Sequence, residues 1–271
     1  MNRVATSIAA IGGLIAGGLA GFLIWGTNGQ SDVELSDAPI VQDLASTPDI
    51  ASTDFAILPC QERNDPGGCV IIAAGGKRVL VDAPSGVGRG QGSDALGTAG
   101  FPDAILLFAL DAVRIEGLDE IRNKLWESGA VRPVPLIGGE GIEEIGSGLD
   151  QTYIVPDAVS YISGRRQGGF DSTPLLVRAV RDGDVAFDTG DLKIWAMAGG
   201  VAQIAYRIEY AGSRVILADC GADSQTVQNW PEVDHYVGCA DVPEQIGSEE
   251  NGKVRSVDWP LREPVFIITS N

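Results

Sequence analysis

GGKRVLVDAPSG at residues 75–86 and ILLFALDAVRIEGL at residues 105–118 carry the clearest structural pattern in this chain. The segments 78–81, apolar from Val79 onward, and 104–108 are short and uninterrupted, as in buried strands, and the glycine-rich segment 85–100 between them predicts a loop with a short helix. Apolar side chains then recur at helical spacing over 118–128 and stop at Gly129. We therefore expect two buried strands, with a helix after the second.

The rest of the chain from residue 55 onward alternates further strands with short helices. We expect strands at 55–58, 69–73, 134–137, 235–237 and 266–269, and helices at 141–148 and 224–230. Residues 175–179, 185–188 and 192–197 predict an antiparallel meander, and 204–210 and 214–218 a hairpin. This interleaving predicts an α/β (α+β) fold with two mixed sheets flanked by helices, a four-layer αββα sandwich, and disfavours a doubly wound parallel sheet.

This pattern resembles the metallo-β-lactamase fold over roughly residues 55–271, which we take as one domain, 54–271. In that family a strand ending in LVDAG precedes a second strand, a metal-binding loop H-x-H-x-D-H and a helix start of the form xEGL. Here the frame is kept at 105–107 and 115–118. Residues 204–220 also resemble the family hairpin GYRIEY…VVxSGDT.

The resemblance implies a metal site that has degenerated. The positions that correspond to ligands hold Ala109, Asp111, Val113, Arg114, Met197 and Asp219. Only Asp219 matches a family ligand, a further ligand region falls near 238–239, and the chain ends at 269–271 where many members have a last histidine. Because His235 is the single histidine, a dinuclear zinc site built from several imidazoles cannot form.

We therefore expect no tight metal binding and no cofactor. Arg114 places a positive charge where a metal would lie, which opposes cation binding. An alternative remains, in which the two carboxylates of Asp111 and Asp219 bind a hard cation such as calcium or magnesium weakly. Asp82 is expected to accept hydrogen bonds from loop backbone.

Other catalytic motifs are absent or incomplete. The chain has no G-x-S-x-G, the serine-bearing turn at 83–86 lacks the spacing of a nucleophile elbow, and a serine triad would depend on His235. The glycine loop 86–92 lacks the Walker lysine and the helix opening of a phosphate cradle.

Residues 1–26 are expected to form a transmembrane signal anchor. Residues 4–26 are uncharged and long enough to cross a bilayer, Arg3 precedes them, and acidic residues follow. The polar segment 27–53 is expected to be a flexible acidic linker. This arrangement predicts a single-pass protein of the bacterial inner membrane with its soluble domain in the periplasm; a cleaved signal peptide is the alternative.

Small residues recur every fourth position along this predicted helix, namely Ala5, Ala9, Gly13, Gly17 and Gly21. Such a stripe allows close helix packing. We expect a contact there with an integral membrane protein complex or with a second copy. The net charge of −18 argues against a nucleic-acid partner.

Four cysteines, an even number in a domain placed outside the cytoplasm, predict disulfides. Cys60 and Cys69 flank a turn between two predicted strands. The fold resemblance places Cys220 beside Cys239 near the former metal site, which implies a second bridge. Free buried thiols, or a cysteine metal pair, are the alternatives.

Together these features predict a membrane-anchored extracytoplasmic pseudoenzyme, acting as an accessory or assembly subunit of a membrane complex. The alternatives are a hydrolase with an atypical metal site at Asp111, Asp219 and His235, and a small-ligand carrier that uses the vacated pocket.

Overall fold

The computed structural model describes residues 50–60, 68–87, 102–127, 132–164, 175–222, 226, 230–231, 233–238, 255–257, 261 and 263–268. They belong to one compact unit, Thr47–Asn271. The predicted anchor 1–26 with its stripe of Ala5, Ala9, Gly13, Gly17 and Gly21, the linker up to residue 49, and Cys239 lie outside the described residues. Within the described part, no helix is long and apolar enough to cross a membrane.

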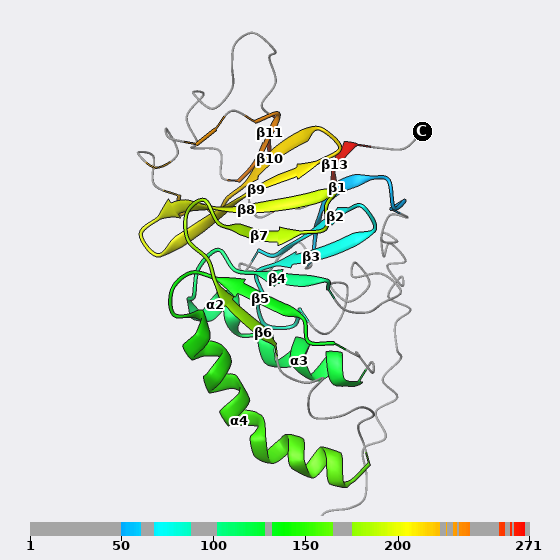
Figure 1. Cartoon of the computed structure of the whole chain (residues 1–271), viewed down its shortest axis with the longest axis vertical. Coiled ribbons are helices and arrows are strands. Elements are labelled where there is room, and N and C mark those ends of the chain that lie inside the picture. Colours follow the sequence, from blue (N-terminus) through cyan, green and yellow to red (C-terminus); the bar gives the residue numbers. More distant parts are fainter. Residues whose placement is uncertain are drawn as a thin grey trace, which may run out of the picture. The chain divides into compact units, whose positions relative to one another are not determined.

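The described strands form two sheets (Figure 1). The first has the order β13-β1-β2-β3-β4-β5-β6. Its strands are β1 (Phe55–Pro59), β2 (Val70–Ala74), β3 (Lys77–Val81), β4 (Ala104–Leu106), β5 (Pro135–Gly138), β6 (Leu176–Ala179) and β13 (Val265–Ile268). From β3 to β6 the pairing is parallel, and the pairs β13–β1, β1–β2 and β2–β3 are antiparallel.

The second sheet has the order β12-β11-β10-β9-β8-β7. Its strands are β7 (Val185–Asp188), β8 (Leu192–Gly200), β9 (Gln203–Tyr210), β10 (Ser213–Leu217), β11 (His235–Val237) and β12 (Arg255–Val257). The predicted hairpin at 204–218 is β9–β10, with Ser213 opposite Tyr210. Strand β12 was not predicted.

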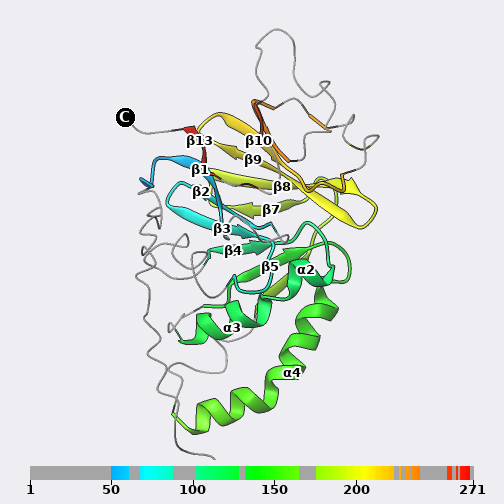
Figure 2. The ribbon, with the colours of Figure 1, turned by 180° about the vertical axis from the view of Figure 1, so that it is seen from behind.

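In the part of the chain that the structure describes, three helices accompany the first sheet: α2 (Ala112–Ile115), α3 (Leu118–Glu127) and α4 (Ile142–Ile162). Figures 1 and 2 show α3 and α4 on the same side of β4–β6. The apolar residues of α3 predicted to be buried, Leu118, Ile121, Leu125 and Trp126, are all buried. Because Leu118, Ile121 and Leu125 pack against Leu80 and Ile105, this helix covers the outer face of the first sheet.

The main core lies between the two sheets. Side chains from the first sheet, such as Ile72 and Leu106, form one cluster with side chains from the second, such as Ile194 and Ile208. Two hydrogen bonds also link the second sheet to the segment after β4: Tyr206 Oη donates to the Leu107 carbonyl in a buried bond (2.7 Å), and Ile204 N donates to the Phe108 carbonyl (2.8 Å). The prediction of two mixed sheets with flanking helices is therefore confirmed. The predicted helix at 224–230 falls largely outside the described residues.

The predicted antiparallel meander is wrong at its first strand. β6 pairs in parallel with β5 in the first sheet, while β7 and β8 pair antiparallel in the second. The intervening helix α4 explains the difference, because parallel neighbours require a long crossover connection. The chain then passes from one sheet to the other between β6 and β7, around Asp182 and Gly183.

The predicted helix at 141–148 is too short. α4 continues to Ile162, through Gly146, Gly148 and Pro156. Gly148, where the predicted helix ends, lies inside α4, and Gly146 is a packing residue, because a Cβ there would lie 2.4 Å from Val177 Cγ2. The glycine lets the helix lie against β6 at this point.

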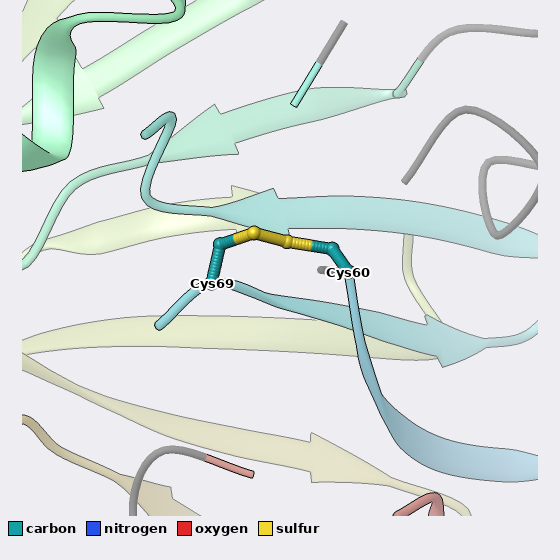
Figure 3. The surroundings of a disulfide bond; sticks show 2 residues. All are labelled: Cys60 and Cys69. Atoms are coloured by element: carbon teal, nitrogen blue, oxygen red, sulfur yellow. A yellow bond between two sulfur atoms is a disulfide. The ribbon is translucent and has the colours of Figure 1, made fainter. Parts of the chain in front are cut away.

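Cys60 and Cys69 form a disulfide between the end of β1 and the start of β2, with Cα atoms 5.5 Å apart (Figure 3). This confirms the first predicted bridge. The second, Cys220–Cys239, stays a prediction, because Cys239 lies outside the described residues.

Replacing both Cys60 and Cys69 by serine is expected to lower the free energy of unfolding by about 2–3 kcal/mol, as for other loops of about ten residues. Both sulfurs lie in a nearly fully buried environment, so two buried hydroxyls add to the loss. Urea titration of the oxidised wild type and the double variant measures the difference. The reduced wild type is the matched control, and if it proves as stable as the oxidised protein, the bridge contributes nothing.

Candidate functional site

The candidate site begins at the carboxyl end of β3, where Asp82 is held in an unusual conformation. Its φ is +63°, in the left-handed region that aspartate tolerates better than most residues. The backbone N–H of Asp82 donates to the Leu106 carbonyl (2.8 Å), and its Oδ1 accepts from Phe108 N (3.0 Å). This confirms the expected bond to loop backbone, and it fixes the buried carboxyl at the end of the first sheet.

Asp111 and Arg114 lie on the loop after β4 and on α2. Asp111 is the N-cap of α2, and its Oδ1 accepts from Arg114 N (3.3 Å). Its Oδ2 accepts from Arg114 Nη1. One short helix turn therefore brings the guanidinium and the first of its carboxylate partners together.

Arg114 also joins the two sheets at this edge. Its Nη2 donates to Oδ2 of Asp219, which follows β10 in the second sheet, and its Nε lies 3.3 Å from Oδ2 of Asp82 in the first. A single guanidinium therefore has three carboxylate partners, from the loops after β3, β4 and β10.

The charges in this cluster influence one another. Burial tends to lower the pKa of the Arg114 guanidinium, but Asp219, Asp82 and Asp111 outweigh it and raise that pKa above its usual value. Burial raises the pKa of the Asp82 carboxyl well above its usual range, against the Phe108 hydrogen bond and the charge of Arg114. Arg114 is thus a permanent cation at the centre of the cluster.

The other expected ligand positions do not contribute donors to this cluster. Ala109 has no donor atom and Val113 is half exposed. Met197 is 6% exposed and packs with Ala205, Ile216 and Tyr236 on the outer face of the second sheet. Gly238, in the expected further ligand region, has no room for a side chain, because a Cβ would lie 2.3 Å from the Tyr236 hydroxyl oxygen.

His235 is not part of the cluster, so the described contacts give no support to the alternative of a site shared by Asp111, Asp219 and His235. His235 begins β11 and pairs with Val215, four residues before Asp219. At 3.3 Å per strand residue this separates His235 from Asp219 by about 13 Å along the strand.

The residues at this edge therefore do not fit a zinc site of the kind the fold implies. Zinc takes three or four ligands, mostly imidazole or thiolate, at about 2 Å. Among the described residues, no group of three His, Cys, Asp or Glu is placed to hold a metal ion. The three carboxylates that do converge here are directed at a guanidinium.

A solved structure with the same architecture identifies the fold. The YhfI protein of Bacillus subtilis, described as a metallo-β-lactamase fold protein, matches over 68% of this chain and 71% of its own, with a TM-score of 0.50 and 13% identity. The fold is the metallo-β-lactamase fold. Zinc-bound PqqB from Methylobacterium extorquens (TM-score 0.47, 12% identity, 68% and 70% covered) and the short form of human tRNase Z (0.46, 13%, 67% and 76%) are further neighbours. No protein-family model matches the sequence, and no curated protein matches it significantly.

The sequence points to Arg114 and to its partner Asp219, but not to Asp82 as a further partner of the guanidinium. It placed Arg114 and Asp219 at ligand positions and treated Asp82 as a residue that only holds backbone. The signal for Asp82 is its position directly after the buried strand β3, which is parallel to β4. The carboxyl ends of parallel neighbours lie at the same edge, so Asp82 and the loop that carries Arg114 must be close.

Proposed function

We propose that this chain is a membrane-anchored extracytoplasmic pseudoenzyme, a metallo-β-lactamase fold without hydrolytic chemistry that acts as an accessory or assembly subunit of a membrane protein complex. The periplasmic location, the anchor 1–26 and the fourth, helical layer of an αββα sandwich are parts of this proposal.

The contacts of Arg114 carry the proposal. Its guanidinium pairs with Asp219, the one residue that matches a family metal ligand, so that carboxylate already has a cationic partner. A metal ion placed there would meet a fixed positive charge, and that repulsion opposes binding by about 1–4 kcal/mol at 4 Å in surroundings between water and a protein surface. The donors that would offset it are missing at Ala109, Val113 and Met197.

The two alternatives have less support. A hydrolase with an atypical metal site would need His235, which lies away from Asp111 and Asp219. A small-ligand carrier would use the vacated edge, where Arg114 now lies. Among the described residues, a cavity of about 320 Å³ lies instead at the start of β8 and the turn between β9 and β10, where Lys193, Tyr210 and Arg214 are among its lining residues. This cavity is at the end of β10 opposite to Asp219.

Elemental analysis of the purified full chain tests the loss of metal chemistry. We expect less than a stoichiometric amount of zinc, manganese or iron, and no esterase or phosphodiesterase turnover after incubation with these metals. An Arg114→His variant is expected to remain inactive, because one imidazole does not supply the missing ligands. One equivalent of tightly bound metal together with turnover in the wild type would overturn the proposal.

Replacing Gly17 by isoleucine is expected to release the chain from its complex or dimer while leaving membrane insertion intact. A bulky side chain on the small-residue stripe prevents close helix approach, and isoleucine keeps the segment apolar. Native gels of mild-detergent extracts measure the change. Gly18→Ile is the matched control, because residue 18 lies off the stripe by about 100° of helix rotation. Equal behaviour of the two variants would count against a specific contact.

A further inference from the structure

Three loops from two sheets converge on a single cation in this structure. Asp82 follows β3 and Asp111 precedes α2 on the side of the first sheet, whereas Asp219 follows β10 in the second sheet. The sequence distance between Arg114 and Asp219 is 105 residues. No backbone element connects these two residues locally, so the contact of Arg114 Nη2 with Asp219 Oδ2 is a long-range cross-link.

The geometry is that of guanidinium recognition. Each of the three nitrogens of Arg114 has its own carboxylate: Nε faces Asp82, Nη1 faces Asp111 and Nη2 faces Asp219. A planar fork of donors suits this arrangement, whereas a metal ion would require the carboxylate oxygens to close around one point. The side chains of Asp82 and Asp219 are 2% and 9% exposed, so two of the three partners are shielded from water.

From these contacts we infer that Asp82, Asp111 and Asp219 form a guanidinium-binding site, filled by Arg114 from within the chain, and that the occupied site joins the two sheets where the metallo-β-lactamase fold would use a metal. The inference goes beyond the proposed function and holds whether or not a membrane partner exists. It assigns the ligand class of the site, a planar guanidinium cation, and it makes Arg114 a structural cross-link.

Chemical rescue of an Arg114→Ala variant of the full chain tests the site. The substitution removes the guanidinium with two methylene groups, so ethylguanidinium is the fragment that fits the space. We expect the Tm of the variant to fall by about 5–15 °C, because buried carboxylates lose their counter-ion. About 20 mM ethylguanidinium is expected to restore at least half of that fall by binding to the folded state alone.

Matched variants and probes distinguish a site from a general effect. Arg114→Met removes the charge but fills the space, so the same concentration of ethylguanidinium is expected to leave its Tm unchanged, as in the wild type. Ethylammonium has the charge without the fork, and Ca²⁺ prefers a cage of oxygen ligands, so neither is expected to rescue Arg114→Ala.

Several outcomes would overturn the inference. The first is an Arg114→Ala protein as stable as the wild type. The second is an equal Tm shift by ethylguanidinium in the wild type, Arg114→Ala and Arg114→Met. The third is rescue of Arg114→Ala by Ca²⁺ to the same extent as by ethylguanidinium. If Arg114→Ala does not fold alone, refolding yield with and without ethylguanidinium replaces the Tm, and equal yields overturn the inference. Metal content and turnover play no part in these readouts, so failure here is separate from failure of the proposed function.

Discussion

An Arg122→Ala protein is expected to lose about 3–5 kcal/mol of folding free energy, because the change leaves a buried carboxylate without its partner. Arg122 on α3 is 3% exposed and donates to both carboxylate oxygens of Asp157 on α4, at 3.2 and 2.6 Å. It also lies 5.2 Å from the ring centre of Tyr153. Asp157 is itself 5% exposed, so water cannot replace the lost donors.

Urea unfolding of the full chain measures this loss, and Arg214→Ala is the matched control. Arg214 is 48% exposed and its Nε lies 3.7 Å from Asp234, so its removal is expected to cost no more than about 1 kcal/mol. Replacing Arg122 by methionine and Asp157 by leucine together is expected to recover most of the loss, since no buried charge remains. Equal effects of Arg122→Ala and Arg214→Ala would show that burial of this pair does not matter.

Hydrogen exchange is expected to locate the destabilisation by Arg122→Ala in α4. The second half of this helix bears several exposed apolar side chains, namely Ile154, Val155, Val159, Tyr161 and Ile162. Besides the Arg122–Asp157 pair, Tyr153 Oη donates to Asp119 Oδ2 (2.6 Å) and ties the helix to α3. We expect the amides of residues 150–162 to exchange faster in Arg122→Ala, because local opening of a helix end requires the loss of only a few contacts.

The sequence predicts the buried strands well because their apolar runs are too short for a buried helix and end at turn residues. The core residues of β3 and β4, such as Leu80 and Ile105, are fully buried, and their runs are bounded by turn residues on both sides. It fails at β6 for a different reason. Four residues of a strand do not reveal which sheet they join, and that choice depends on the crossover through α4.

Helix length and the full Arg114 cluster required three-dimensional information. The sequence predicts that this helix ends at Gly148, yet α4 continues to Ile162, and Gly146 within it is a contact point with Val177 on β6. Likewise, the charge of Arg114 is visible at once, but its pairing with Asp82 and Asp219 depends on how three loops meet. Local patterns predict elements, and tertiary packing determines which polar residues share a site.

Replacing Gly117 by alanine is expected to cost about 2–4 kcal/mol, because the added methyl group has no space. A Cβ at residue 117 would lie 2.2 Å from the Pro84 carbonyl oxygen, 2.7 Å from Val87 Cγ1 and 3.0 Å from the Ala83 carbonyl oxygen. Two of these three atoms belong to backbone and cannot turn aside. Gly117 N also donates to the Ala83 carbonyl (2.7 Å), so the two segments are in direct contact.

The same contact positions the Arg114 cluster. Ala83 N donates to the Arg114 carbonyl (2.9 Å), and Asp82 immediately precedes Ala83. Pushing the segment after α2 away from residues 83–84 therefore moves Arg114 relative to Asp82. We expect Gly117→Ala to lower stability. We also expect Arg114→Met to lower stability much less in the Gly117→Ala background than in the wild type, and a double-mutant cycle in urea measures this difference.

Gly148→Ala is the matched control, since a Cβ at residue 148 would meet no atom within 4 Å. Residue 148 lies inside α4, where alanine favours the helix by up to about 1 kcal/mol over glycine, so this variant is expected to be as stable as the wild type or more so. If Gly117→Ala behaved like Gly148→Ala, the close approach of the segment after α2 to residues 83–84 would not constrain the fold. If the effects of Gly117→Ala and Arg114→Met were additive, the approach would not position the guanidinium.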